Sequence, residues 1–241
     1  LQFCGEDKKV IAITSCTPNE GKSSVSLKLA ISLAESGKNV LFIDADLRKS
    51  VLLGRTKAGQ QTVKGLTHYL TGQAELKDVV YATNVPKLYL IYSGPFPPNP
   101  AELLGGKNFR SFLKAVRKVY DYVIVDTPPL GSVIDSAVIA EECDGAILVI
   151  ESGAISYRFA QEVKAQLEKS NCPILGVVLN KFDVRKQAYG KYGKYYGKYY
   201  GDYGKKQEKK IMRKGLVAIL FLVCGVLLAG NVVAYVGEDH S

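Results

Sequence analysis

Histidine and cysteine are scarce and scattered in this sequence, and their scarcity excludes several kinds of site. The 241 residues include two histidines, His68 and His240, which are too distant to suggest a shared metal site or a Ser-His-Asp triad. The five cysteines show no zinc-ligand or redox-motif spacing, so we expect reduced, structural thiols in a cytosolic compartment. No signal peptide is predicted at Leu1, and we expect the sequence to begin inside a longer protein.

Positive charge is concentrated in one strip of the chain. The formal net charge is +9, and residues 186–214 contribute +8 of it through ten Lys or Arg and two acids. A near-neutral body with one basic strip does not fit a wholly basic nucleic-acid-binding domain. A chain of this length with 47% hydrophobic residues can bury a core without disulfides, and its composition excludes collagen-like, fully disordered and disulfide-scaffold classes.

Short apolar runs alternate with helix-like stretches in the first 185 residues. The runs are hydrophobic almost throughout, which is typical of strands buried on both faces of a parallel sheet. We predict strands at residues 9–14, 39–44, 88–93, 122–126, 145–151 and 174–180. We predict helices at residues 22–36, 107–120, 134–143 and 156–170. This alternation predicts a doubly wound α/β domain with a mostly parallel sheet, over residues 1–185.

The composition changes twice beyond residue 185. Residues 186–214 are rich in Tyr, Gly and Lys without apolar periodicity, so we predict a flexible basic tail. Residues 215–236 are apolar, and a helix of that length spans roughly 33 Å, enough to cross a bilayer core. We therefore predict a transmembrane helix, the alternative being a buried terminal helix. Basic residues precede it and a short acidic end, 237–241, follows, so the positive-inside rule places the α/β domain at the cytoplasmic face of the membrane.

A phosphate-binding loop is predicted between the first strand and the first helix. The run CTPNEGKS at residues 16–23 matches the P-loop pattern G-x-x-x-x-G-K-[ST], with Cys16 in place of the first glycine. Backbone N–H groups at a helix N-terminus bind phosphate, Lys22 can reach the β and γ oxygens, and the Ser23 hydroxyl can ligate Mg²⁺. We place the ATP-contacting residues of this loop at Pro18, Asn19, Glu20, Gly21, Lys22, Ser23 and Ser24.

Acidic residues follow two further predicted strands, at the sheet edge where this fold places catalysis. A carboxylate there is unfavourable unless it is paired or metal-bound. Asp126 fits the Walker B pattern and is expected to hold Mg²⁺, whereas Asp44 and Asp46 can supply a second metal contact and a base. Helix capping is the alternative, above all for Asp46. Arg48, beside the pair, is expected either to bind phosphate or to tie down an acid.

The chain resembles the bacterial tyrosine autokinases (BY-kinases) of capsule and exopolysaccharide synthesis, and most of all the soluble kinases of Gram-positive capsule systems. The resemblance covers about residues 1–204 and rests on a Tyr-rich tail and the segments TPNEGKSS, VLFIDADLRKS, SGPFPPNPAELL and YDYVIVDTPP. It implies a P-loop NTPase-like fold that binds Mg-ATP through Walker A, second Walker (A-prime) and Walker B motifs. The implied catalytic residues are Lys22, Asp44, Asp46 and Asp126.

The resemblance also assigns roles within this set. Asp44 is the candidate base, and the metal shell would comprise Ser23, Asp46 and Asp126, although the sequence does not settle how Asp44 and Asp46 divide their roles. Asn180, at the end of its strand, would lie on the adenine side of the ATP site. The phosphoacceptors would be the seven tail tyrosines, Tyr189, Tyr192, Tyr195, Tyr196, Tyr199, Tyr200 and Tyr203.

The function that the resemblance implies is regulation of capsule or exopolysaccharide synthesis and export. The expected partners are a transmembrane activator of export, other copies of the chain, a tyrosine phosphatase and, for the basic tail, an anionic membrane surface; no nucleic acid is expected. Three features depart from the family. Asn19 stands where the family usually has glycine, the Glu-x-x-Arg-x-x-Arg helix used for ring assembly is absent, and an apolar segment after the tail is unusual.

Three other functions fit parts of the sequence. A partitioning or membrane-cycling ATPase of the ParA/MinD type shares the fold, but it carries a signature lysine at the position of Thr17 and no tyrosine cluster. Residues 180–183, NKFD, match the guanine-reading N-K-x-D pattern of GTPases, but the D-x-x-G element would need glycine at Pro129. Interleaved Lys and Tyr can bind RNA or DNA, but that reading leaves the three acids and the P-loop unexplained.

Overall fold

A single twisted sheet forms the centre of the molecule. The structure, a computed structural model, describes residues 8–50, 63–182 and 232–234. Within them the sheet has eight strands in the order β3-β4-β2-β5-β1-β6-β7-β8, and all neighbours are parallel except β3 and β4. The strands are β1 (Val10–Ser15), β2 (Val40–Asp44), β3 (Tyr81–Ala82), β4 (Leu88–Ile91), β5 (Tyr122–Asp126), β6 (Gly145–Glu151), β7 (Ile174–Asn180) and β8 (Val232–Ala234).

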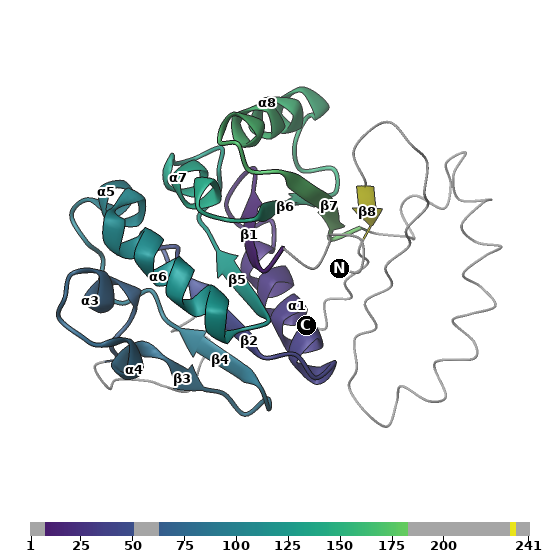
Figure 1. The fold of residues 1–241 in the computed structure, drawn as a ribbon. Helices are drawn as coiled ribbons and strands as arrows, with labels where there is room; N and C mark the ends of the chain where they lie inside the picture. The colour runs from purple at the N-terminus through teal and green to yellow at the C-terminus, as the bar shows by residue number, and fades with distance from the viewer. Residues whose placement is uncertain (1–7, 51–62, 183–231, 235–241) are drawn as a thin grey trace, which may run out of the picture.

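Helices cover both faces of this sheet (Figure 1). They are α1 (Lys22–Glu35), α3 (Leu66–Leu70), α4 (Leu76–Val79), α5 (Pro100–Gly105), α6 (Lys107–Val119), α7 (Asp135–Glu141) and α8 (Tyr157–Lys169). Successive residues of β1 alternate between the two faces: Ile11 packs in the cluster that holds Leu29 of α1, whereas Val10 packs in the cluster that holds Phe112 of α6. The predicted doubly wound α/β fold is thereby confirmed.

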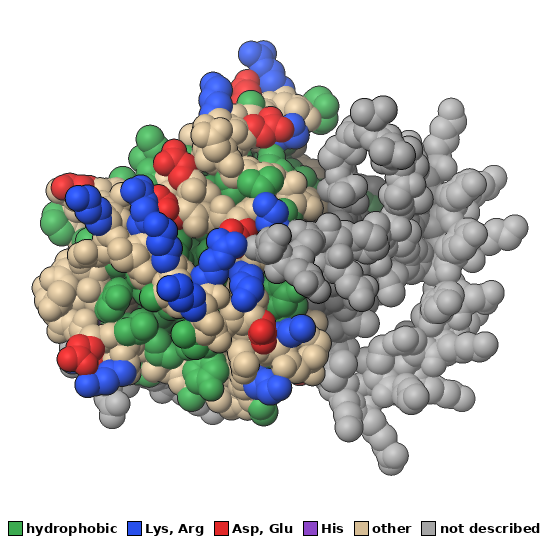
Figure 2. Space-filling model, viewed as in Figure 1, with side chains coloured by type: hydrophobic (Ala, Val, Ile, Leu, Met, Phe, Trp, Pro, Cys, Tyr) green, Lys and Arg blue, Asp and Glu red, His purple; other side chains and the backbone are tan. Residues whose placement is uncertain are grey.

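Helix α6 illustrates how the sequence pattern selects the buried face. Phe109, Phe112, Leu113 and Val116 repeat at helical spacing and are all buried against the sheet. Figure 2 shows Lys and Arg side chains gathered over the opposite, outer face of α6. The amphipathic pattern therefore places the helix on the sheet with its basic face in solvent.

The long predicted elements agree with the structure to within two residues at each end. The short elements α3, α4, α5 and β3 were not predicted, because segments of two to six residues contain too little periodicity to be recognised. The core consists of one cluster under α6 and two further clusters, one under α1 and one under α7 and α8. Because β1, β2, β5, β6 and β7 pair in parallel, their carboxyl ends meet at one edge of the sheet.

The C-terminal predictions lie almost entirely outside the described residues. This applies to the seven tyrosines, to the tail 186–214, to the acidic end 237–241 and to most of the predicted membrane helix 215–236. The described part of that helix, Val232–Ala234, is instead strand β8, which pairs in parallel with β7. Among the helices of the described segments, none has both the length and the apolar character needed to cross a membrane.

Candidate nucleotide and phosphoryl-transfer site

The loop between β1 and α1 has the backbone shape of a phosphate-binding loop. Gly21 adopts a left-handed conformation with φ of 84°, and a Cβ atom there would lie 2.2 Å from Asn180 Nδ2. A larger residue would therefore be both strained and too close to its neighbour. Helix α1 begins immediately afterwards, so its N-terminal turn follows this loop directly and contains three of the predicted ATP-contacting residues: Lys22, Ser23 and Ser24.

Cys16 and Asn19, the two unusual residues of the loop, are both accommodated. The Cys16 side chain is fully buried in the core under α7 and α8, and burial raises the pKa of its thiol to about 12. This cysteine is therefore a packing residue that stays protonated. Asn19 takes a φ of 67°, a left-handed conformation that asparagine tolerates better than most residues.

Glu20 lies inside the molecule and braces the loop. Its carboxylate accepts hydrogen bonds from the Thr17 N–H at 2.9 Å and from the Glu151 N–H, at the end of β6, at 3.4 Å. Its carbonyl oxygen accepts a bond from Asn180 Nδ2, at the end of β7, at 2.9 Å. The predicted contact of Glu20 with ATP can therefore come only from its backbone, and Asn180 supports the loop itself.

Lys181, which sequence reasoning missed, also holds this loop. Its Nζ donates to the Asn19 carbonyl at 2.9 Å and pairs with Glu151 Oε2 at 3.0 Å. The only signal for it in the sequence is its place in the NKFD run, which matches a guanine-reading pattern. The segment that leads toward the tyrosine cluster thus begins at a residue that touches the phosphate loop.

Asp44 and Asp126 lie side by side, because β2 and β5 are neighbours and the two acids are register partners. Lys22 Nζ pairs with Asp126 Oδ1 at 3.1 Å, and both side chains are buried. Ser26, a residue that sequence reasoning missed one turn into α1, also donates to Asp126 Oδ1, at 2.9 Å. The Walker A lysine and the Walker B acid are therefore in direct contact.

Asp44 has the environment of a proton acceptor. Burial, followed by the nearby Asp126 charge, raises its pKa from the ordinary 3.8 to about 7, against the opposing effects of a hydrogen bond from Ser50 and the Lys22 charge. Ser50 Oγ donates to Asp44 Oδ2 at 2.5 Å, and the Asp46 N–H donates to Oδ1 at 3.2 Å. A carboxyl that exchanges its proton near neutral pH is suited to general-base chemistry.

Asp46 and Arg48 occupy the loop after β2. Asp46 is 8% exposed, and its Oδ1 accepts a bond from the Lys49 N–H at 3.0 Å, so it stabilises a turn. Arg48 forms a two-pronged bridge with Asp135, through Nε at 2.6 Å and Nη2 at 3.1 Å. Of the two roles expected for Arg48, tying down an acid is the one the structure contains, although that acid is not Asp44 or Asp46. Sequence reasoning did not single out Asp135, whose only signal was its position at a predicted helix start.

The oxygen atoms suited to a divalent cation converge near the phosphate loop. Ser23 Oγ and Asp126 Oδ1 lie 3.2 Å and 3.1 Å from the same Lys22 Nζ. No group of three or more His, Cys, Asp or Glu side chains forms a metal cage in the described segments. Mg²⁺ does not require such a cage beside a nucleotide, because it keeps several waters and uses one or two carboxylates plus substrate phosphates. The residues present therefore fit Mg²⁺ bound together with a nucleotide.

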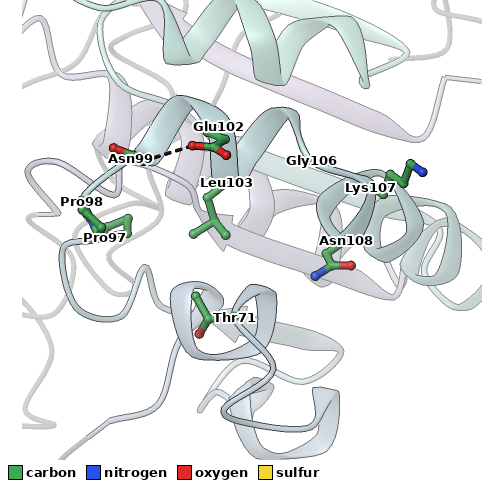
Figure 3. Close-up of a pocket in the computed structure, with 9 residues that line it drawn as sticks. All are labelled: Thr71, Pro97, Pro98, Asn99, Glu102, Leu103, Gly106, Lys107 and Asn108. Atoms are coloured by element: carbon green, nitrogen blue, oxygen red, sulfur yellow. Dashed lines mark hydrogen bonds between the residues drawn. The ribbon is translucent and has the colours of Figure 1, made fainter.

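A pocket lies beside the SGPFPPNPAELL segment. The pocket has a volume of about 330 Å³. Figure 3 shows its lining residues on the proline-rich loop, α5 and the start of α6, with Thr71 on the far side. Asn99 Nδ2 donates to Glu102 Oε2 at its edge, at 3.1 Å. None of its lining residues belongs to the predicted nucleotide site, so this segment forms a surface separate from the phosphate loop.

Comparison with known proteins places these features in context. A family model described as an AAA domain matches residues 8–169. Tyrosine-protein kinase CpsD of Streptococcus agalactiae is 46% identical over 195 residues, which are 81% of this chain and 85% of that protein. The kinase domain of the Escherichia coli tyrosine kinase ETK matches with a TM-score of 0.67 and 35% identity, over 71% of this chain and 67% of that chain. The septum site-determining protein MinD of Pyrococcus horikoshii, complexed with Mg-ADP, matches with a TM-score of 0.62 and 25% identity, over 72% and 70%.

Proposed function

This chain belongs to the family of bacterial tyrosine-protein kinases, and from that membership we propose that it transfers the γ-phosphoryl group of Mg-ATP to tyrosines of its own C-terminal segment. The observation that carries the proposal is the convergence of Lys22, Asp126 and Asp44 beside the α1 N-terminus. Seven tyrosines within residues 189–203, among glycines and lysines, supply the acceptors.

The chain's own groups account for binding and proton transfer. The N–H groups of the loop and of α1 hold the phosphates, and Lys22 moves from Asp126 to the γ-phosphate. Ser23, Asp126 and Asp46 would hold Mg²⁺, which would supply neutralisation of the phosphate charge. The acceptor tyrosine oxygen forms a bond to the γ-phosphorus, the bond from that phosphorus to the β–γ bridging oxygen breaks to leave ADP, and the tyrosine proton passes to Asp44.

The proposal is tested by incubating the full chain with Mg-ATP and mapping phosphate by intact mass and peptide sequencing. Lys22→Met should abolish phosphotyrosine because it removes a phosphate contact, whereas Lys38→Met, at an exposed site, should not change labelling. Replacing the seven tail tyrosines with Phe should remove most labelling and spare ATP binding. Normal labelling of Lys22→Met would show that the phosphate site is misassigned.

Substitutions of Asp126 and of Asp44 should have different effects on nucleotide binding and on phosphoryl transfer. Asp126→Asn should weaken nucleotide binding in Mg²⁺ because it removes one of the few anionic ligands, whereas Asp44→Asn should lower the transfer rate more than binding. Nucleotide titrations with Mg²⁺ and with EDTA distinguish these effects. Equal losses of binding in both variants would contradict the division of roles.

A partitioning or membrane-cycling ATPase is the alternative, favoured by the likeness to MinD. The two functions differ in where the phosphoryl group goes. ATP hydrolysis without any phosphotyrosine in the parent protein would favour the ATPase.

The cellular role we propose is regulation of capsule or exopolysaccharide synthesis and export at the cytoplasmic face of the membrane. The partners would be a transmembrane activator of export, further copies of this chain and a tyrosine phosphatase. The +8 charge of residues 186–214 supports attraction to anionic lipid. Each phosphotyrosine would add about −1.5 to −2 charges, so phosphorylation of all seven would add roughly −10 to −14 and reverse the sign of the segment. Salt-sensitive binding of the full chain to anionic vesicles should therefore weaken after autophosphorylation; equal partitioning of both forms would contradict this switch.

A further inference from the structure

Helix α7 begins where the loops that follow β2 and β5 come together. Asp135, its first residue, is 0% exposed and accepts both prongs of Arg48 from the loop after β2. Ser136, the next residue, is 1% exposed, and its Oγ donates to the carbonyl oxygen of Pro128 in the loop after β5. Two adjacent, buried residues of one helix thus each hold one of the acid-bearing loops.

The connections from this helix to the reacting acids are short. Arg48 lies two residues beyond Asp46, and the loop between is stiffened by the bond from the Lys49 N–H to Asp46 Oδ1. Pro128 lies two residues beyond Asp126, and its carbonyl also accepts a bond from Thr14 Oγ1 at 3.0 Å. A displacement of Asp135 and Ser136 would therefore shift Arg48 and Pro128, each only two residues away from an acid of the site.

We propose that Asp135 is a positioning residue for phosphoryl transfer, acting through Arg48 on the loop that carries Asp46 and directly follows Asp44 at the end of β2. Ser136 supplies the complementary hold on the loop beyond Asp126. The proposal rests on the proposed kinase function, because it concerns the geometry of the same acids.

The chemistry of the bridge favours positioning over a general structural role. A two-pronged Arg–carboxylate pair fixes both distance and angle, which a single contact does not. Asp135 is wholly buried, so its carboxylate requires the guanidinium, and Arg48 is held to one orientation. The bridge uses Nε and Nη2 on one edge of the guanidinium, so it fixes Arg48, and through Arg48 the loop after β2, relative to the start of α7.

The test compares Asp135→Asn with a matched control at the other end of the same helix. Glu142, the C-cap of α7, pairs with Arg110 Nε at 2.6 Å, so Glu142→Gln removes an ion pair of equal length away from the acids. At saturating Mg-ATP we expect the autophosphorylation rate to fall about tenfold in Asp135→Asn and less than about twofold in Glu142→Gln. ATP affinity in EDTA should stay within about twofold of the parent in both variants, because the phosphate loop is intact.

A double-variant cycle separates positioning from direct phosphate contact by Arg48. If the bridge acts as a unit, adding Arg48→Gln to Asp135→Asn should cause little further loss of rate. The double variant leaves no unpaired buried charge. If the melting temperature of Asp135→Asn is too low for the assay, the same fall in autophosphorylation rate, about tenfold, is therefore expected of the double variant. Additive losses, or a weaker ATP affinity caused by Arg48→Gln alone, would overturn the proposal.

Two controls complete the test: thermal melting curves of the variants and measurement of phosphotyrosine in the parent protein. A rate loss that follows the unfolded fraction at the assay temperature would make Asp135 merely structural and refute the inference. Equal rates in Asp135→Asn and Glu142→Gln, with phosphotyrosine present in the parent, would refute the inference alone. Absence of phosphotyrosine in the parent would refute the proposed function, and the inference with it.

Discussion

Replacing Asp44 with asparagine should make the nucleotide-free protein more stable at alkaline pH. Asp44 is 1% exposed, and its pKa is raised to about 7 by burial and then by the Asp126 charge. Above pH 7 the folded chain therefore holds an ionised carboxylate in an environment that disfavours it. Asparagine keeps an oxygen acceptor at this position without the charge.

The size of the effect follows from the two pKa values. In the unfolded chain Asp44 titrates near 3.8, so between that pH and about 7 the folded state binds more protons than the unfolded state. The free energy of unfolding of the parent therefore falls as pH rises through this window and levels off above it. The full difference corresponds to an upper value of about 4 kcal/mol, at about 1.36 kcal/mol per pH unit.

Urea unfolding of the parent and of Asp44→Asn at pH 5 and pH 8, without nucleotide, measures this effect. The stability advantage of the variant should grow by about 3 kcal/mol between the two pH values, because two of the pH units in the window lie above pH 5. Asp78→Asn, at a surface ion pair with Lys64, is the control and should show no comparable growth. A difference between parent and Asp44→Asn that does not change with pH would refute the reasoning.

A second substitution at the same site should change the stability at alkaline pH in the opposite direction. Ser50 donates to the Asp44 carboxylate and lowers its pKa, so Ser50→Ala should raise that pKa further and destabilise the protein at pH 8 relative to pH 5. Asp44→Asn should meanwhile lose tyrosine phosphorylation. Gained stability and lost activity in one variant would identify an acid that is retained for chemistry at the expense of the fold.

Three further substitutions test the framework around the site. Gly21→Ala should weaken nucleotide binding by about tenfold or more, measured by fluorescence titration, because it strains a left-handed residue and crowds Asn180. Lys181→Met should raise the KM for ATP by a few fold, because the Asn19 carbonyl loses its partner, with kcat little changed. Gly65→Ala should lower stability by about 1–3 kcal/mol in urea unfolding, because its Cβ would lie 2.4 Å from backbone atoms of the loop after β4.

The sequence was sufficient for the six longer strands and for the acids that end two of them. Near-continuous apolar runs identify buried strands, and a terminal Asp on two of them identifies the reactive edge of the sheet. What the sequence does not contain is strand order. That Asp44 and Asp126 are register partners follows from β2 and β5 being neighbours, although 82 positions separate them in the chain.

The parts of the site that escaped prediction depend on long-range side-chain contacts. Asp135 reads in sequence as an ordinary acid at a helix start, and its bridge to Arg48 spans 87 positions. The Glu20 carboxylate lies inside the molecule, where it accepts a hydrogen bond from the Glu151 N–H at the end of β6. Asn180 Nδ2 donates to the Glu20 carbonyl from 160 positions away in the chain. Periodicity and local motifs carry no information on such pairs, because each partner is chosen by the packed fold.

The contact between Lys22 and Asp126 explains why nucleotide binding and catalytic readiness should be linked. This pair satisfies two buried charges, and the Lys22 charge also helps to lower the pKa of Asp44. When Lys22 turns to a phosphate, Asp126 loses its counter-charge and the pKa of Asp44 rises, unless another cation takes the place of the lysine. Under the proposed mechanism, a nucleotide without a divalent cation should therefore leave Asp44 with a raised pKa and make it a poorer acceptor of the tyrosine proton. The position of Lys22 between the phosphate loop and the acids would in that case favour Mg-ATP over ATP alone.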